Sequence, residues 1–258
     1  MADEILRVEG LGKHFGGLVA VDVERMVVGR GSITALIGPN GAGKTTLFNQ
    51  LTGFDRPDRG TITFDGTDVS GWSPSRIARR GIVRTFQLTK VFGRMSVLDN
   101  LKLAAPRQDG ERMLVGPIAR RWRGQERAIQ RRADELLEQF RLVRVRDEFA
   151  GTLSGGQRKL LEMARALMAE PKLVLLDEPM AGVNPSLVEE ILSHVRSLRD
   201  AGLTVLFVEH DMDVVMGISD TVICMAQGRV ISVGSPRQVV GDPEVRSAYL
   251  GLDAGVAQ

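Results

Sequence analysis

GPNGAGKTT, residues 38–46, is the stretch that decides the fold predicted from this sequence. It follows the apolar run SITALIG and precedes a run with helical spacing, which is the strand–loop–helix context that the pattern G-x-x-x-x-G-K-[ST] requires. Its three glycines allow the loop to turn backbone N–H groups inward around a phosphate, and the following helix adds its positive end. A plain glycine turn is the weaker interpretation, because every fixed position of the pattern is matched in the right context.

Two side chains of this loop have expected tasks of their own. Lys44 is expected to reach the β- and γ-phosphates of a nucleotide, and the hydroxyl of Thr45 to ligate Mg²⁺. We therefore predict ATP and Mg²⁺ as ligands. The predicted nucleotide-binding residues of the loop are Gly38, Pro39, Asn40, Gly41, Ala42, Gly43, Lys44, Thr45 and Thr46.

A second motif, LVLLDEP at 173–179, places two carboxylates at the end of an apolar strand. Open parallel sheets bind ligands at the carboxyl ends of their strands, and successive strand residues point to opposite sides. We expect Asp177 to hold Mg²⁺ through water and Glu178 to polarise the water that attacks the γ-phosphate. Alone, the motif is also compatible with a solvated strand end, but the phosphate loop strengthens the catalytic interpretation.

The stretch SGGQ at 154–157 resembles the start of a second phosphate-binding helix. Ser154 and Gln157 fit a capping box, so one interpretation is that they only begin a helix. A capping box does not need the two glycines Gly155 and Gly156, whose backbone donors are open to a phosphate. Since the chain has one phosphate loop, we predict that this second set serves the nucleotide of another protomer.

The rest of the chain alternates apolar runs with helical patterns, which predicts an α/β fold with a mainly parallel sheet. Strands are expected at 32–38, 172–177, 204–209 and 221–230, and helices at 44–53 and 185–202. The first thirty residues and 60–69 suggest an antiparallel addition, and the pattern from about 95 to 165 is largely helical.

Composition excludes several other classes. The chain has 258 residues, of which 43% are apolar and 26% charged, as in an ordinary globular protein. Cys224 is its single cysteine, so disulfides and cysteine metal sites are excluded and a buried core thiol is expected. The sequence shows no N-terminal signal and no apolar run of the roughly 18 residues that a spanning helix needs. A net charge of +2 gives no reason to expect nucleic acid as a partner.

The motifs GPNGAGKTT, LSGGQ, LLDEP and VEHD, in this order and at these distances, resemble the nucleotide-binding subunit of an ATP-binding-cassette (ABC) transporter. More narrowly, VRTFQ, MSVLDNL, AGVNP, EHDMDVVMGISD and AYLG resemble the ATPase subunit of bacterial importers for branched-chain amino acids. The resemblance implies a P-loop NTPase core (RecA-like) with an antiparallel β-subdomain. It also implies one ABC ATPase domain over 1–258, with an inserted α-helical subdomain at about 92–166.

The resemblance also implies roles for three further residues. Phe15 matches the aromatic side chain that stacks on adenine, and His210 in VEHD matches the switch histidine at the γ-phosphate. Gln87 matches the residue that senses the γ-phosphate and Mg²⁺ and faces the membrane subunits. The expected catalytic residues are therefore Glu178, His210 and Gln87, and the expected metal ligands are Thr45, Gln87 and Asp177.

The function implied is ATP hydrolysis that drives import through separate membrane permease subunits, at the cytoplasmic face of the membrane. A second cassette, identical or different, and an external binding protein are the other expected partners. Urea or amides are an alternative cargo, and a soluble cassette that remodels ribosomes or DNA is the rival class. A GTPase is disfavoured because no N-K-x-D motif follows the phosphate loop.

Three positions do not match the resemblance. Asn184 stands where many cassettes carry an aspartate in the loop that crosses the dimer interface. His14 and His194 match no motif, and we expect both at the surface.

Overall fold

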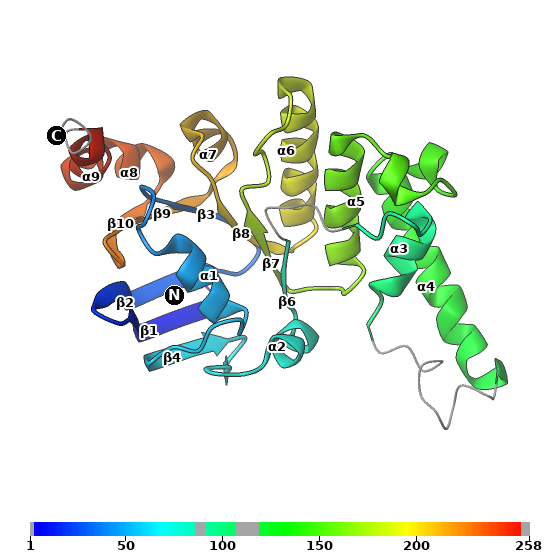
Figure 1. Cartoon of the computed structure of the whole chain (residues 1–258), viewed down its shortest axis with the longest axis horizontal. Helices are drawn as coiled ribbons and strands as arrows, with labels where there is room; N and C mark the ends of the chain where they lie inside the picture. The colour runs from blue at the N-terminus through cyan, green and yellow to red at the C-terminus, as the bar shows by residue number, and fades with distance from the viewer. Residues whose placement is uncertain (1–2, 86–90, 107–118, 254–258) are drawn as a thin grey trace.

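The structure, a computed structural model, describes residues 3–85, 91–106 and 119–253. It contains a six-stranded sheet in the order β10-β9-β3-β8-β7-β6 (Figure 1). The pairs β3/β8, β3/β9, β7/β8 and β6/β7 are parallel, and only β10 runs antiparallel to its neighbour within this sheet. The strands are β3 (Ile33–Ile37), β6 (Ile82–Arg84), β7 (Leu173–Asp177), β8 (Thr204–Val208), β9 (Thr221–Ala226) and β10 (Arg229–Gly234).

A second, antiparallel sheet has the strand order β2-β1-β4-β5. Its strands are β1 (Glu4–Phe15), β2 (Leu18–Gly29), β4 (Arg59–Phe64) and β5 (Thr67–Asp68). The antiparallel addition expected from the first thirty residues and from 60–69 is therefore present, with β1 and β2 as long strands of 12 residues each.

The central strands are buried on both faces, which explains their continuous apolar runs. Along β3, Ala35 packs into the core on the helical side, whereas Leu36 packs into the core shared with the second sheet and α1. The same alternation holds in β8, where Phe207 and Leu206 enter the two cores. Because successive strand residues face opposite sides, one short strand contributes to both cores.

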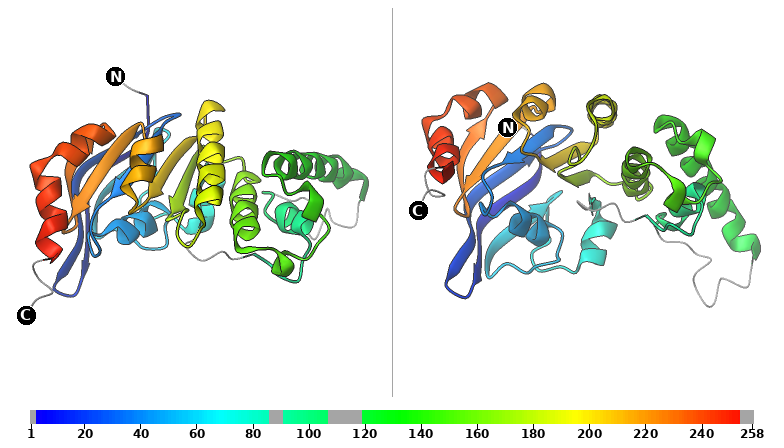
Figure 2. Two further views of the ribbon diagram at one scale, coloured as in Figure 1. Left: turned by 90° about the horizontal axis from the view of Figure 1, so that it is seen from above. Right: turned by 45° about the horizontal axis from the view of Figure 1, so that its top comes forward.

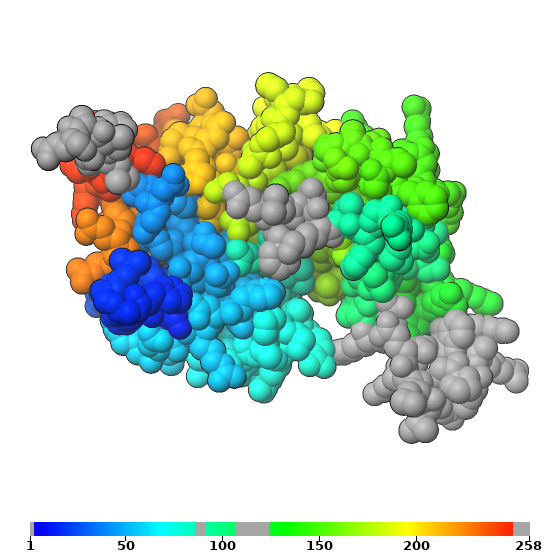
Figure 3. Space-filling model, in the orientation of Figure 1, coloured from blue at the N-terminus to red at the C-terminus, as the bar shows by residue number. Residues whose placement is uncertain are grey.

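The helices connect these strands and cover the sheet. They are α1 (Lys44–Leu51), α2 (Pro74–Arg80), α3 (Val97–Leu103), α4 (Ala119–Gln139), α5 (Gly155–Leu167), α6 (Pro185–Asp200), α7 (Met212–Ile218), α8 (Pro236–Gly241) and α9 (Pro243–Asp253), with 3-10 turns at Val143–Val145 and Ala150–Thr152. In Figures 2 and 3, α3–α5 lie at one end of the molecule and α8 and α9 at the other. The predicted α/β fold is confirmed, and the subdomain boundary near 92–166 stays a prediction.

Two local predictions from the sequence are wrong. The strand expected at 221–230 is a hairpin, because Gln227 and Gly228 adopt left-handed backbone angles (φ 49° and 80°) and reverse the chain between β9 and β10. His194, expected at the surface, is 9% exposed and stacks on Phe140 with ring centroids 4.5 Å apart. It lies on the buried face of α6, and burial lowers its pKa. His14 is exposed, as expected.

Among the described residues, no helix is both long enough and apolar enough to cross a membrane.

Candidate nucleotide-binding site

The predicted catalytic motifs meet at one edge of the six-stranded sheet. β3, β8 and β7 are neighbours and parallel, so their carboxyl ends lie side by side. The phosphate loop follows β3, Glu178 follows β7, and His210 comes two residues after β8. This is the edge at which open α/β sheets bind ligands.

The phosphate loop has a backbone that only glycine accommodates at two of its positions. Gly38 (φ 147°) and Gly43 (φ 97°) both lie in the left-handed region. A Cβ on Gly38 would lie 2.1 Å from the carbonyl oxygen of Met225, and one on Gly43 would lie 2.3 Å from that of Ala20. The backbone of the loop is therefore packed closely against both sheets.

Lys44 is folded back onto this loop. Its side chain is buried, and the Nζ atom donates to the carbonyl oxygens of Gly38 at 2.6 Å and Pro39 at 2.9 Å. Burial lowers the pKa of Lys44, while Glu178 and Asp177 act in the opposite direction. The ammonium group is thus held at the mouth of the loop by acceptors that a phosphate could replace.

A pocket of ≈ 290 Å³ collects most of the predicted site residues. Phe15 lies on one wall and is 52% exposed, with the Nζ atom of Lys13 5.4 Å from its ring centroid. The pocket is also lined by Asn40, Gly41, Ala42, Gly43, Lys44, Thr45, Thr46, Glu178 and His210. Its donors and exposed aromatic face fit a nucleotide, because the phosphates would lie on the loop and the base against the ring.

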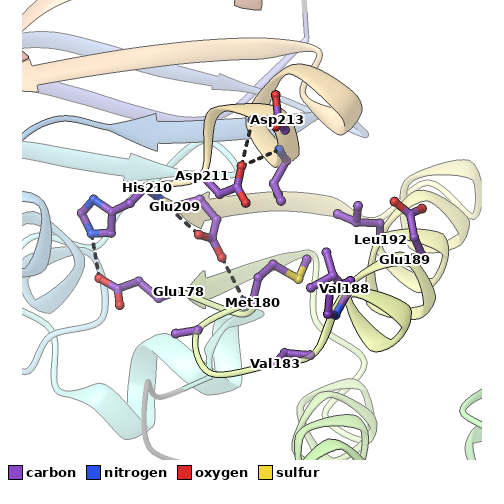
Figure 4. A pocket seen from close by; sticks show the side chains of 13 residues that line it. Glu178, Met180, Val183, Val188, Glu189, Leu192, Glu209, His210, Asp211 and Asp213 are labelled. Carbon is purple, nitrogen blue, oxygen red and sulfur yellow. Dashed lines mark hydrogen bonds and ion pairs between the residues drawn. The ribbon is translucent and has the colours of Figure 1, made fainter.

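Glu178 and His210 form a contact across the pocket. The Nε2 atom of His210 lies 2.9 Å from Oε1 of Glu178, and the two side chains face each other in Figure 4. Glu178 has a left-handed backbone (φ 45°), which costs a non-glycine residue on the order of 1–3 kcal/mol. Its backbone N–H donates to the carbonyl oxygen of Val208 at 3.0 Å, so the neighbouring strand helps to hold this conformation.

Asp177 lies behind this pair and contacts a residue that the sequence did not single out. Its Oδ2 atom accepts from Nη2 of Arg84 at 2.6 Å, and Nη1 of Arg84 donates to Oδ1 of Asn49 at 2.6 Å. Arg84 ends β6 and precedes the predicted sensor Gln87, which lies outside the described residues. The only sequence signal for Arg84 was its place in VRTFQ.

The SGGQ segment begins α5 with the predicted capping box. The backbone N–H of Gln157 donates to Oγ of Ser154 at 3.2 Å, and the N–H of Ser154 donates to Oε1 of Gln157 at 2.9 Å. None of residues 154–157 lines the pocket that contains the phosphate loop. Within one chain, the structure therefore does not bring the second donor set to the first.

The two glycines of this segment differ in their surroundings. A Cβ on Gly156 would lie 2.2 Å from Cδ2 of Leu187, so packing against α6 alone accounts for this glycine. A Cβ on Gly155 would meet nothing within 4 Å. Of these two glycines, Gly155 is therefore the one that lacks a steric reason within the described part of the chain.

Comparison with known proteins decides the family. A family model described as ABC transporter matches residues 23–181, and one described as branched-chain amino acid ATP-binding cassette transporter matches 229–254. The chain belongs to the ABC transporter family. The resemblance inferred from the sequence is therefore confirmed, and with it the expectation of an ATPase.

Curated relatives of this cassette extend over nearly its whole length. The probable branched-chain amino acid transport ATP-binding protein LivG of Archaeoglobus fulgidus is 43% identical and covers 96% of each chain. The high-affinity branched-chain amino acid transport ATP-binding protein BraF of Pseudomonas aeruginosa is 41% identical and covers 97% of this chain and 99% of its own.

Solved structures agree with the fold of this cassette. A nucleotide-free ATP-binding cassette from an ABC transporter superposes with a TM-score of 0.82 at 39% identity, covering 95% of this chain and 98% of that one. Another ABC transporter cassette, in its ADP conformation, gives a TM-score of 0.81 at 38% identity, covering 96% and 99%.

Proposed function

We propose that this cassette is the ATP-hydrolysing subunit of an importer for branched-chain amino acids, with separate membrane permease subunits. The observation that carries the proposal is the convergence of Phe15, the phosphate loop, Glu178 and His210 on one pocket. The cargo follows from the match at 229–254 and from the names of the relatives, which also disfavour a ribosome- or DNA-remodelling cassette. In the complex, the subunit would lie at the cytoplasmic face of the membrane.

Each side chain in the pocket has a task in this proposal. On nucleotide binding, the ammonium group of Lys44 gives up its hydrogen bonds to the carbonyl oxygens of Gly38 and Pro39 and donates to the β- and γ-phosphate oxygens instead. Glu178 accepts a proton from the attacking water, and His210 holds Glu178 and the γ-phosphate in register. Phe15 offers its exposed face to adenine.

The oxygen atoms that Asp177 and its neighbours offer fit Mg²⁺, which prefers a few protein oxygens combined with phosphate oxygens and water. Thr45, Asp177 and Gln87 would hold the ion, whose charge would stabilise the developing negative charge on the phosphates. Among the described residues, no cluster of three His, Cys, Asp or Glu forms a separate metal site. Arg84 would share the carboxylate of Asp177 with this ion.

We also propose that a second cassette completes each nucleotide site through its SGGQ segment. The support is the open space at Gly155 and the absence of 154–157 from the lining of the phosphate-loop pocket. Residues of about 92–166 would then move as a subdomain. Together with Gln87, they would transmit closure of the cassettes to the permease.

Replacing Phe15 by alanine should weaken ATP binding several-fold, since stacking of an aromatic ring is worth on the order of 1 kcal/mol. The melting temperature should stay near that of the wild type, because the side chain is 52% exposed. Titration with a fluorescent ATP analogue would measure the change in affinity. Phe149→Ala, at a ring that is 60% exposed and does not line the pocket, is the matched control. A large loss of stability with unchanged affinity would make Phe15 a packing residue instead.

Replacing Gly155 by alanine should lower ATP hydrolysis by about 10-fold or more, although the chain itself has room for the methyl group. The physical reason is that a partner's phosphate would need close approach to the backbone at this helix start. Gly124→Ala, at another helical glycine with nothing within 4 Å, is the control, and both variants should be at least as stable as the wild type. Wild-type hydrolysis by Gly155→Ala would remove the reason to place a nucleotide there.

To test the function, the chain is co-expressed with its permease and a second cassette, and the purified complex is reconstituted into proteoliposomes. Uptake is then measured in the presence of the external binding protein. ATP-dependent uptake of labelled leucine, isoleucine and valine is expected. Uptake of urea or short amides in their place would correct the cargo, and failure to assemble with a permease would overturn the transporter role.

A further inference from the structure

Glu209 is a buried carboxylate between the two loops that carry the catalytic pair. It is 4% exposed and directly precedes His210. Among the described residues, no lysine or arginine forms an ion pair with it. A buried charge is costly unless hydrogen bonds compensate, so the partners of this carboxylate identify its role.

Those partners are backbone N–H groups on both loops. Met180 donates to Oε1 of Glu209 at 2.9 Å, and His210 donates to Oε2 at 3.2 Å. Figure 4 shows the carboxylate reaching toward Met180, with its other oxygen turned to the backbone of His210. Burial raises the pKa of Glu209, and the N–H groups of Met180, His210 and Asp211 oppose that rise.

The two hydrogen bonds of Glu209 connect the loop after β7 to the loop after β8. Met180 follows Glu178 by two residues, so one carboxylate fixes the loop after β7 and the loop after β8 at the same time. The contact of 2.9 Å between His210 and Glu178 connects the same two loops. A cavity of ≈ 520 Å³ is lined by Glu178, Met180, Glu209 and His210, so packing alone does not hold the two loops together there.

We propose that Glu209 is a positioning residue, whose carboxylate sets the separation of Glu178 and His210 by accepting hydrogen bonds from N–H groups of both loops. We call this pair of hydrogen bonds, from Met180 and His210 to Glu209, the clamp. This inference rests on the catalytic roles proposed above for Glu178 and His210. Glu209 itself touches neither nucleotide nor water in the reaction and acts through the backbone of the two loops.

Glu209→Gln tests the clamp with a side chain of the same size. One amide oxygen can accept one N–H group, but the amide NH₂ then faces the other donor and cannot accept from it. In the assembled transporter, kcat should fall on the order of 10-fold, because small misplacements of catalytic groups are costly. KM for ATP should stay within about 2-fold, because Glu209 does not line the phosphate-loop pocket.

Glu189→Gln is the matched control, because Glu189 is an exposed carboxylate that lines the same ≈ 520 Å³ cavity. It should leave kcat unchanged. In a Glu178→Gln background, Glu209→Gln should cause no further loss of turnover, since the clamp acts through Glu178 and His210. Independent, multiplicative losses would show a general structural defect and overturn the proposal.

A second measurement does not depend on activity. In the nucleotide-free chain, ¹⁵N NMR of the imidazoles should show shifted His210 signals in Glu209→Gln. The signals of the exposed His14, whose Nδ1 atom lies 3.5 Å from Asp58, should stay unchanged. Unchanged His210 signals, or unchanged kcat, would overturn the positioning role. Full turnover by Glu178→Gln would overturn the proposed catalytic role of Glu178. The NMR comparison tests the role of Glu209 separately, because it does not depend on turnover.

Discussion

Glu178→Gln is expected to lower ATP hydrolysis by about 10²-fold or more while leaving ATP binding intact. The amide preserves the size of the side chain, and its oxygen can still accept from Nε2 of His210 at the observed separation of 2.9 Å. It cannot take up the proton of the attacking water. The left-handed backbone at Glu178 (φ 45°) should survive, because Val208 still accepts its N–H.

Steady-state phosphate release by the assembled complex measures this prediction, together with equilibrium binding of ATP. Glu189→Gln is again the control, because it removes a nearby carboxylate outside the phosphate-loop pocket. Turnover near the wild-type rate in Glu178→Gln would exclude Glu178 as the general base. Loss of binding as well as turnover would mean that the substitution disturbs the pocket.

The central fold was predictable because its signals are local. The apolar runs at β3, β7 and β8 are short and buried on both faces, and the phosphate loop between β3 and α1 has a fixed pattern. The hairpin between β9 and β10 was missed because its turn is Gln227-Gly228, a weak signal inside an apolar stretch. The burial of His194 was missed because it depends on Phe140, which is distant in the sequence.

In the candidate site, too, local features could be predicted from the sequence and long-range contacts could not. Motif residues such as Lys44 and Glu178 could be predicted one by one, because each has a fixed neighbour in the sequence. Contacts between motifs could not. The pairing of Arg84 with Asp177 spans 93 positions and that of Met180 with Glu209 spans 29, so only the folded chain reveals them.

The two glycines of the SGGQ segment differ in what explains them within one chain. In the sequence, Gly155 and Gly156 are equivalent candidates for contacting a phosphate. In the structure, a side chain at Gly156 would collide with Leu187, so packing within one chain explains this glycine. The capping box is present, so Ser154 has an intramolecular role in any case. The prediction of a site shared between two protomers therefore depends on Gly155 and on what lies opposite it.

Cross-linking decides whether Ser154 also serves a second chain. One variant carries Asn40→Cys and another Ser154→Cys, both in a Glu178→Gln background that preserves the closed state; both side chains belong to exposed residues. With Mg²⁺ and ATP, the mixture should form a disulfide between chains, because bond formation requires Cα atoms within about 7 Å. ADP should not support it, since closure depends on the γ-phosphate.

The native thiol gives a built-in control for this experiment. Cys224 is buried, and burial raises its pKa to about 11, so a Glu178→Gln chain whose only cysteine is Cys224 should give no cross-link. Since the second cassette is either identical or different, each cysteine variant is tested both with this chain and with the partner cassette. An ATP-dependent bond in either pairing places Ser154 at a partner's phosphate loop. If neither pairing cross-links, while one chain carrying both cysteines closes on itself, the shared site is wrong and Ser154 only caps α5.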